Sequence, residues 1–195
     1  MDALPNVIQR FNWVDIFVII LSLRILYIAF KTGFVSELFK LLGTLLAVYV
    51  GMHYYTAFSD LLRSRFGLEK KIPLDFLDFI CFILLVAVSY LVGILFRQVF
   101  CRLIKLEAVP RLNQWGGLII GIFRAVLLAG LFVFIFSITS IQYLHNKAAG
   151  SYFGNDLIKV APQAYSSIWN GFMSKFMPSE KFNTTIPEVQ KNFNQ

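Results

Sequence analysis

Apolar residues fall into four long runs along the chain, separated by short polar segments. The runs cover residues 13–30, 34–57, 76–96 and 115–141. A bilayer hydrocarbon core about 30 Å thick needs about 20 apolar helical residues, and each run is close to or above that length. The fourth run is the clearest, because Arg124 is its only charge. The pattern therefore predicts an all-α integral membrane protein with four transmembrane helices.

The segments around these runs predict shorter elements. Residues 1–13 have the composition of an interfacial helix, and residues 97–105 that of a basic amphipathic extension lying along lipid headgroups. A tight turn is expected at residues 31–33, where Gly33 can take a positive φ. Residues 58–67 predict a short surface helix that ends at its glycine.

The C-terminal third is amphipathic rather than uniformly apolar. Apolar residues recur at steps of three and four over about residues 156–177, which predicts a helix lying on the membrane or on the bundle. Asn170 and Gly171 should interrupt this helix and Pro178 should end it. Residues 179–195 show no periodicity and predict a flexible tail. Residues 1–178 would then form a single four-span domain.

Small residues recur every fourth position in the second and fourth runs. This spacing places them along one side of a helix, where another helix backbone can approach closely. We therefore expect the bundle to pack through two stripes. They are Gly43, Ala47 and Gly51 in the second run, and Gly117, Gly121, Ala125 and Ala129 in the fourth.

Composition supports lipid as the surrounding solvent. Hydrophobic residues make up 57% of the 195 residues and charged residues 15%, which leaves too little polar surface for a water-soluble globule of this size. The formal net charge is +7. The basic residues sit singly beside apolar runs, so the expected partner is the anionic surface of a lipid bilayer and not a nucleic acid.

Charged residues inside the apolar runs need an explanation, because charges are costly within a membrane. Counting helical rise along the runs places four of them in one half of the bilayer: Arg24, Glu37, Lys40 and Arg124. Asp15, Asp75 and Asp78 fall toward the other side. Glu37 is the one carboxylate deep enough to pair with either arginine.

Two interpretations of this group stay open. In the first, Arg24 and Lys40 reach the headgroups while Glu37 and Arg124 form a structural pair that fixes helix register. In the second, the group forms a positively charged polar vestibule that admits an anionic or zwitterionic solute or a peptide.

The sequence contains no recognisable catalytic, phosphate-binding or metal-binding motif. We therefore expect no catalytic residues, no cofactor and no bound metal. Asp75 and Asp78 stand at the start of a run, where acidic residues cap helices, and Asp75 is the expected N-cap. His53 falls in an aromatic belt and predicts an interfacial polar residue.

Several stretches resemble the colicin V production protein family of bacterial membrane proteins. They are Asp15 at the first run, Gly33-Phe-Val-Ser-Glu-Leu38 with Gly43 at the second, Asn113-Gln-Trp-Gly-Gly-Leu-Ile-Ile-Gly-Ile-Phe-Arg124 at the fourth, and Val160-Ala-Pro-Gln-Ala-Tyr165 beyond it. The likeness covers about residues 13–178. Family members usually carry a charged residue where this chain has Gln114.

The resemblance implies a bacterial inner-membrane protein linked to colicin V production or export, with no established reaction. We therefore expect a non-enzymatic protein that supports the passage of a toxin or solute. The alternative is a scaffold or accessory subunit of a larger membrane complex, which would use a small-residue stripe or the C-terminal helix to bind a partner protein or a second copy. Basic residues are distributed too evenly between the two sides to predict orientation.

Overall fold

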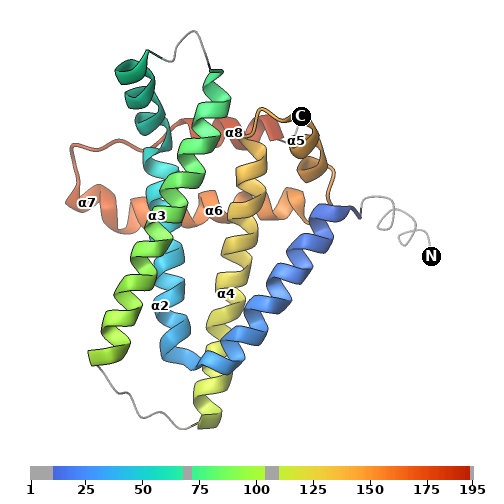
Figure 1. The fold of residues 1–195 in the computed structure, drawn as a ribbon, viewed down its shortest axis with the longest axis vertical. Coiled ribbons are helices and arrows are strands. Elements are labelled where there is room, and N and C mark those ends of the chain that lie inside the picture. Colours follow the sequence, from blue (N-terminus) through green and yellow to red (C-terminus); the bar gives the residue numbers. More distant parts are fainter. Residues whose placement is uncertain (1–10, 68–71, 104–109, 194–195) are drawn as a thin grey trace.

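The computed structural model describes residues 11–67, 72–103 and 110–193, and the regular elements in these ranges are helical (Figure 1). The predicted interfacial helix at residues 1–13 lies almost wholly outside the described residues. The elements are α2 (Trp13–Phe66), α3 (Leu74–Leu103), α4 (Pro110–Ser137), α5 (Gln142–Ala149), α6 (Gly154–Ile168), the π-helical turn η2 (Trp169–Met173), α7 (Ser174–Phe176) and α8 (Thr185–Phe193).

The longest helix, α2, has 54 residues and a kink at Gly33, whose φ of 80° and ψ of 174° are not helical. The kink divides α2 into a first arm, residues 13–32, and a second arm, residues 34–66, which diverge in Figure 1. A turn at this glycine is what the sequence predicts. The predicted separate helix at residues 58–67 is wrong, because the second arm continues to Phe66. Gly67, with φ of 60°, then ends it as expected.

Three helices among the described residues are long and apolar enough to cross a membrane. They are α2, the part of α3 from Leu74 to Phe100, and the part of α4 from Arg111 to Ser137. The helical class and the apolar spans of the sequence analysis are confirmed in this form.

The two small-residue stripes pack on different partners rather than on each other. A Cβ built on Gly43 would lie 3.3 Å from the Cα atom of Gly93, so the second arm meets α3 there. A Cβ on Gly117 would lie 2.6 Å from the carbonyl oxygen of Ala29, so α4 meets the first arm. Gly121 also faces Ala29. The remaining small residues of the stripes are buried: Ala47, Gly51, Ala125 and Ala129.

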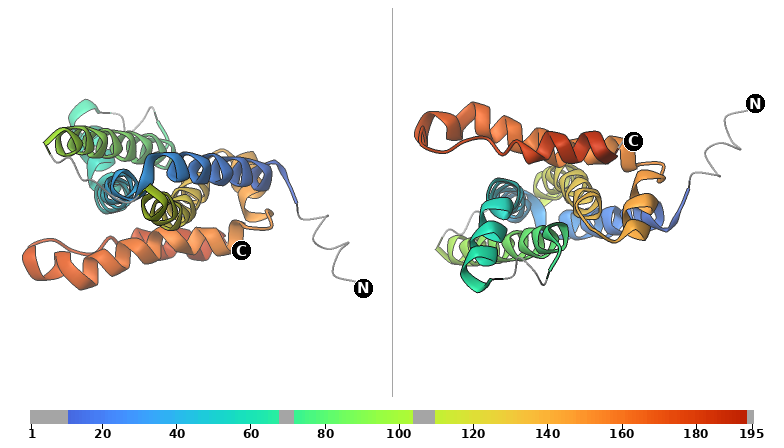
Figure 2. Two further views of the ribbon diagram at one scale, coloured as in Figure 1. Left: turned by 90° about the horizontal axis from the view of Figure 1, so that it is seen from below. Right: turned by 90° about the horizontal axis from the view of Figure 1, so that it is seen from above.

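Helix α6 crosses the bundle almost at right angles to α4 and forms, with α8, a second layer on one face (Figures 1 and 2). Its apolar side is buried through Ile158, Ala161 and Tyr165. Gly130 allows the approach, because a Cβ there would lie 2.8 Å from Val160. Of the two predicted positions, the structure therefore has the amphipathic helix on the bundle. The expected interruption appears as η2, which contains Asn170 and Gly171.

The expectation of a flexible tail at residues 179–195 is wrong for the described part. Residues 185–193 form α8, and its Ile186 and Phe193 side chains are buried in the core. Just before it, the Asn183 side chain donates a hydrogen bond to the Met52 carbonyl (2.7 Å). The segment is ordered because the apolar side of α8 packs on α4 and α6, which are separate elements of the chain.

Candidate functional site

Glu37 is the centre of a charged cluster inside the bundle. Its side chain is fully buried. Its Oε1 atom accepts hydrogen bonds from Thr32 Oγ1 (2.6 Å) and Lys40 Nζ (2.5 Å). Arg124 Nη2 lies 3.0 Å from Oε2, which is ion-pair distance. Three of the four residues placed together by the sequence argument are therefore in contact.

The kink at Gly33 sets this geometry. It places Thr32 at the end of the first arm beside Glu37 in the first turn of the second arm. The second arm begins with the Phe34 N–H, which donates to Asn113 Oδ1 on α4 (2.7 Å). A Cβ on Gly33 would lie 2.3 Å from the Asn113 amide nitrogen. Only glycine therefore allows both the backbone conformation and the close contact with α4.

A cavity of about 320 Å³ lies beside this cluster, and we call it the cationic cavity. Its basic lining residues are Arg24, Lys40, Arg97 and Arg124, which come from both arms of α2, from α3 and from α4. Its other lining residues are Tyr90 and the aliphatic residues Leu21, Ile25, Ile28, Ile94 and Leu128. The cavity thus joins a basic wall to an apolar wall.

The basic groups of the cationic cavity are only partly satisfied by the protein. Arg24 is exposed and makes no hydrogen bond or ion pair with any described residue. Arg97 donates through Nη1 to Ser36 Oγ (3.2 Å). The Nε atoms of Arg97 and Arg124 are buried without a hydrogen-bond partner among the described residues. Arg97 belongs to the segment that the sequence analysis places along the headgroups, and its place in the cavity was not predicted.

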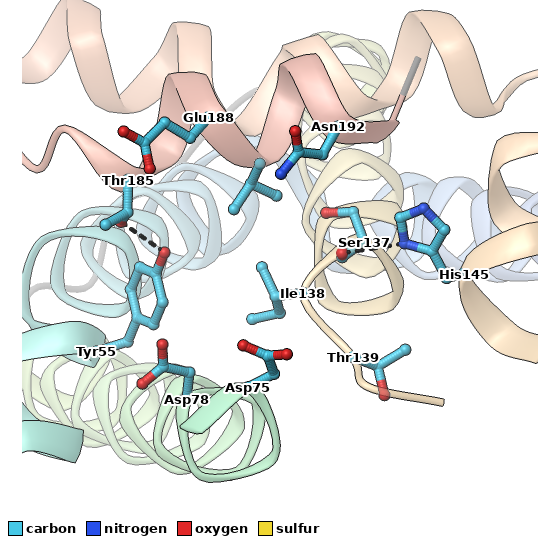
Figure 3. A pocket seen from close by; sticks show the side chains of 11 residues that line it. Tyr55, Asp75, Asp78, Ser137, Ile138, Thr139, His145, Thr185, Glu188 and Asn192 are labelled. Atoms are coloured by element: carbon cyan, nitrogen blue, oxygen red, sulfur yellow. Dashed lines mark hydrogen bonds between the residues drawn. The ribbon is translucent and has the colours of Figure 1, made fainter. Parts of the chain in front are cut away.

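A second cavity, of about 290 Å³, lies at the opposite end of the bundle, and we call it the acidic cavity (Figure 3). Asp75 and Asp78 of α3 and Glu188 of α8 line it, together with His145 and Tyr55. Asp78 accepts a hydrogen bond from Ser59 on α2. Because α3 begins at Leu74, Asp75 lies in the first turn and is not the N-cap that the sequence predicts.

Asp15 is also fully buried, near the start of the first arm. It accepts hydrogen bonds from the backbone N–H groups of Asn12 (2.9 Å), Tyr152 (3.2 Å) and Phe153 (3.0 Å). The Asn12 side chain in turn accepts from the Val14 N–H and completes a capping box. Asp15 therefore holds the beginning of α2 against the start of α6.

Comparison with known families gives one match. The model of the family described as colicin V production protein matches residues 14–162. The chain belongs to the colicin V production protein family. No curated protein and no solved structure is significantly similar to the chain.

The part of the chain that matches the colicin V production protein family contains both halves of the charged cluster. Gly33, Glu37, Asn113 and Arg124 all lie in it, whereas α8 lies beyond it. Family membership and the apolar helices together indicate a membrane protein. The resemblance described from the sequence is confirmed at the level of the family.

His53, which the sequence predicts as an interfacial polar residue of an aromatic belt, is covered by other parts of the chain. Its side chain is buried and stacks on Tyr49 and Trp169. Its Nδ1 lies 2.9 Å from the Tyr165 hydroxyl and its Nε2 3.2 Å from Glu180. Burial raises the pKa of the Tyr165 phenol, which therefore stays protonated at neutral pH. The burial of His53 under α6 was not predicted.

Metal-ligating side chains are not gathered in either cavity. Among the residues that the structure describes, no three His, Cys, Asp or Glu side chains lie close enough together to hold a metal ion.

Proposed function

We propose that the protein is a four-span protein of the bacterial inner membrane that supports toxin production or export by passage of an anionic or zwitterionic solute. The cationic cavity carries this proposal. It joins a buried carboxylate–guanidinium pair to further basic groups that the chain itself does not neutralise. Such groups within a membrane-spanning bundle mark solute pathways more often than surface charges do.

The kink in α2 supports the proposal of four spans. The first arm, residues 13–32, is about 30 Å long at the rise of an α-helix, which matches a hydrocarbon core. The second arm is longer and returns in the opposite sense in Figure 1. Each arm therefore crosses once, and α3 and α4 supply the other two crossings. In this placement α6 lies near the interface opposite Gly33, with its apolar side on the bundle.

The proposed role is non-enzymatic. Glu37, the buried carboxylate of the cluster, contacts two cations and a hydroxyl, so all its contacts are those of a structural ion-pair partner. A scaffold that binds a partner through a small-residue stripe is less well supported. Gly43 and Gly117 already pack on α3 and on the first arm, and α6 is already packed on α4.

Proteoliposomes that contain only this protein test the proposal. Uptake of radiolabelled glutamate and of radiolabelled phosphate is measured against protein-free vesicles. We expect uptake of at least one anion above that background, and a loss of that uptake in an Arg97→Gln variant. An Arg111→Gln variant, altered at an exposed residue outside the cavity, should keep it. Absence of flux together with co-purification of a stoichiometric partner would instead support the scaffold role.

A further inference from the structure

We propose that the cationic cavity binds the phosphate group of an amphiphile, so that the phosphate meets the basic wall and an apolar chain lies along the aliphatic wall. This names a ligand class for the site of the proposed function and rests on that proposal for the position of the cavity within the membrane. We assign the phosphate to the headgroup of a membrane lipid, because a lipid also supplies the apolar chain.

The charge of the cavity calls for an anion from outside the chain. Arg24, Lys40, Arg97 and Arg124 line it, and no described lining residue is a carboxylate. The ion pairs of the described residues bring one carboxylate to these cations, that of Glu37, which lies against Lys40 and Arg124. A net positive charge therefore remains in surroundings of low dielectric, where an unpaired charge is costly.

The unused hydrogen-bond donors favour phosphate over other anions. Arg97 and Arg124 line the cavity, and each has a buried Nε–H without a hydrogen-bond partner among the described residues. Guanidinium groups present planar pairs of N–H donors, which match the oxygens of a phosphate. Two arginines with free donors and a third with no bonded partner, Arg24, form a suitable set.

The shape of the cavity favours an amphiphile over a small ion. A bare phosphate would leave most of the 320 Å³ unfilled and the aliphatic wall unsatisfied. That wall is formed by Leu21, Ile25 and Ile28 of the first arm, with Ile94 and Leu128 opposite. Arg24 is exposed, so the cavity reaches the outer surface of the bundle. A chain attached to the phosphate can leave there and continue into the surrounding lipid.

Three probe molecules test the proposal on the full chain in a neutral detergent. One has both the phosphate and the acyl chains, and each of the other two lacks one of these parts. Dioleoylphosphatidic acid carries the phosphate and the chains, dioleoylglycerol lacks the phosphate, and sn-glycerol 3-phosphate lacks the chains. Native mass spectrometry measures retention of the two lipids, and titration calorimetry measures binding of the soluble ester. We expect phosphatidic acid to be retained about tenfold or more over dioleoylglycerol.

The test variant is Arg24→Gln combined with Arg97→Gln, which removes two cavity charges and leaves the Glu37 contacts with Lys40 and Arg124 in place. The matched control is Arg111→Gln, the same change at an exposed residue in the first turn of α4. We expect about tenfold weaker phosphate binding in the double variant and no change in the control. If the double variant does not stay monodisperse, Arg24→Gln alone replaces it, because Arg24 makes no bond within the described chain.

Each outcome of these measurements either supports binding of a phosphate-bearing lipid or overturns it. Retention of phosphatidic acid that the variant loses supports a lipid headgroup. Binding of glycerol 3-phosphate without retention of phosphatidic acid would show that the apolar chain contributes nothing, and it overturns the inference. Equal retention of the two lipids without binding of the soluble ester, or equal binding by the double variant and the control, overturns the inference. Lipid binding is measured in detergent, independently of transport. A failed uptake assay would therefore not change the binding result, and failed lipid binding would not change the uptake result.

Discussion

The two ends of the bundle handle their buried and half-buried charges in opposite ways. At the end where α6 and α8 pack, the carboxylates of Asp15 and Asp78 are met by hydrogen-bond donors of the chain itself: backbone N–H groups for the first and a serine hydroxyl for the second. At the Gly33 end, basic groups outnumber the one carboxylate they meet, and some of their N–H donors have no partner among the described residues.

The difference indicates which end is built for a ligand. A polar group that is hydrogen-bonded within the chain contributes to the fold, and it has less hydrogen-bonding capacity left for a ligand. A buried donor without a partner is a cost that folding alone does not explain. The other end also has an unpartnered buried donor, Arg63 Nε near Asp78. What distinguishes the cationic cavity is its excess of basic groups over carboxylates, and there the proposed ligand would lower the free energy of the folded protein.

The largest effect should come from removing the charge on Glu37. Glu37→Gln leaves Arg124 and Lys40 buried without an anion, so we expect the free energy of unfolding in detergent to fall by about 3–5 kcal/mol. Glu188→Gln, at an exposed carboxylate of the acidic cavity, should change it by less than about 0.5 kcal/mol. Additive losses in a double-mutant cycle with Arg124→Gln would show that the two residues are not coupled.

Asp15→Ala should have the next largest effect, through hydrogen bonds rather than through charge pairing. Three backbone N–H groups lose their acceptor, and we expect a loss of about 3 kcal/mol in unfolding free energy. Hydrogen exchange at the Tyr152 and Phe153 amides should become faster. The control is Asp156→Ala, an exposed acid in the first turn of α6, with an expected loss of about 0.5 kcal/mol. Equal losses in both variants would argue against the buried acceptor.

Gly33→Ala should destabilise the Gly33 end by about 2 kcal/mol, because its backbone conformation is open to glycine alone and its Cβ would meet Asn113. Gly67→Ala is the matched variant, since Gly67 also has a positive φ but has no atom within 4 Å of the added Cβ. We expect Gly67→Ala to lower the free energy of unfolding by about 1 kcal/mol. Thermal unfolding of the two variants isolates the contribution of the contact with α4. If both lose the same stability, the Asn113 contact does not matter.

Ser59→Ala should have the smallest effect. It removes the hydroxyl that Asp78 accepts from, for an expected loss of about 1 kcal/mol. Ser64→Ala serves for comparison, because that hydroxyl donates only to the Leu61 carbonyl of its own helix and is exposed. Its loss should be close to zero. Chemical denaturation of both variants measures the difference in unfolding free energy. A larger loss for Ser64→Ala would contradict a stabilising hydrogen bond between Ser59 of α2 and Asp78 of α3.

Features that depend on position along one helix could be predicted from the sequence. The contact between Glu37 and Arg124 follows from depth, which is helical rise multiplied by residue count. The turn at Gly33 follows from a glycine between two apolar runs. Both stripes follow from fourfold spacing, although spacing alone cannot say that Gly43 faces Gly93 and Gly117 faces Ala29.

Features that depend on how helices meet could not be predicted in this way. Arg97 turns into the cationic cavity because Gly93, one turn earlier, lies against Gly43 and sets the register of α3 on the second arm. His53 is buried because α6 and the segment before α8 lie over it. Ile186 and Phe193 are buried for the same reason. In each case the deciding partner lies on a different element of the chain, where periodicity carries no information.

The bond between Asp15 and the Phe153 N–H has a consequence for how the protein is made. The two residues are 138 positions apart, so the first helix must enter the bilayer long before its carboxylate receives these donors. The opening segment can be locked only after the start of α6 has been synthesised, so this joint closes late in the synthesis of the chain.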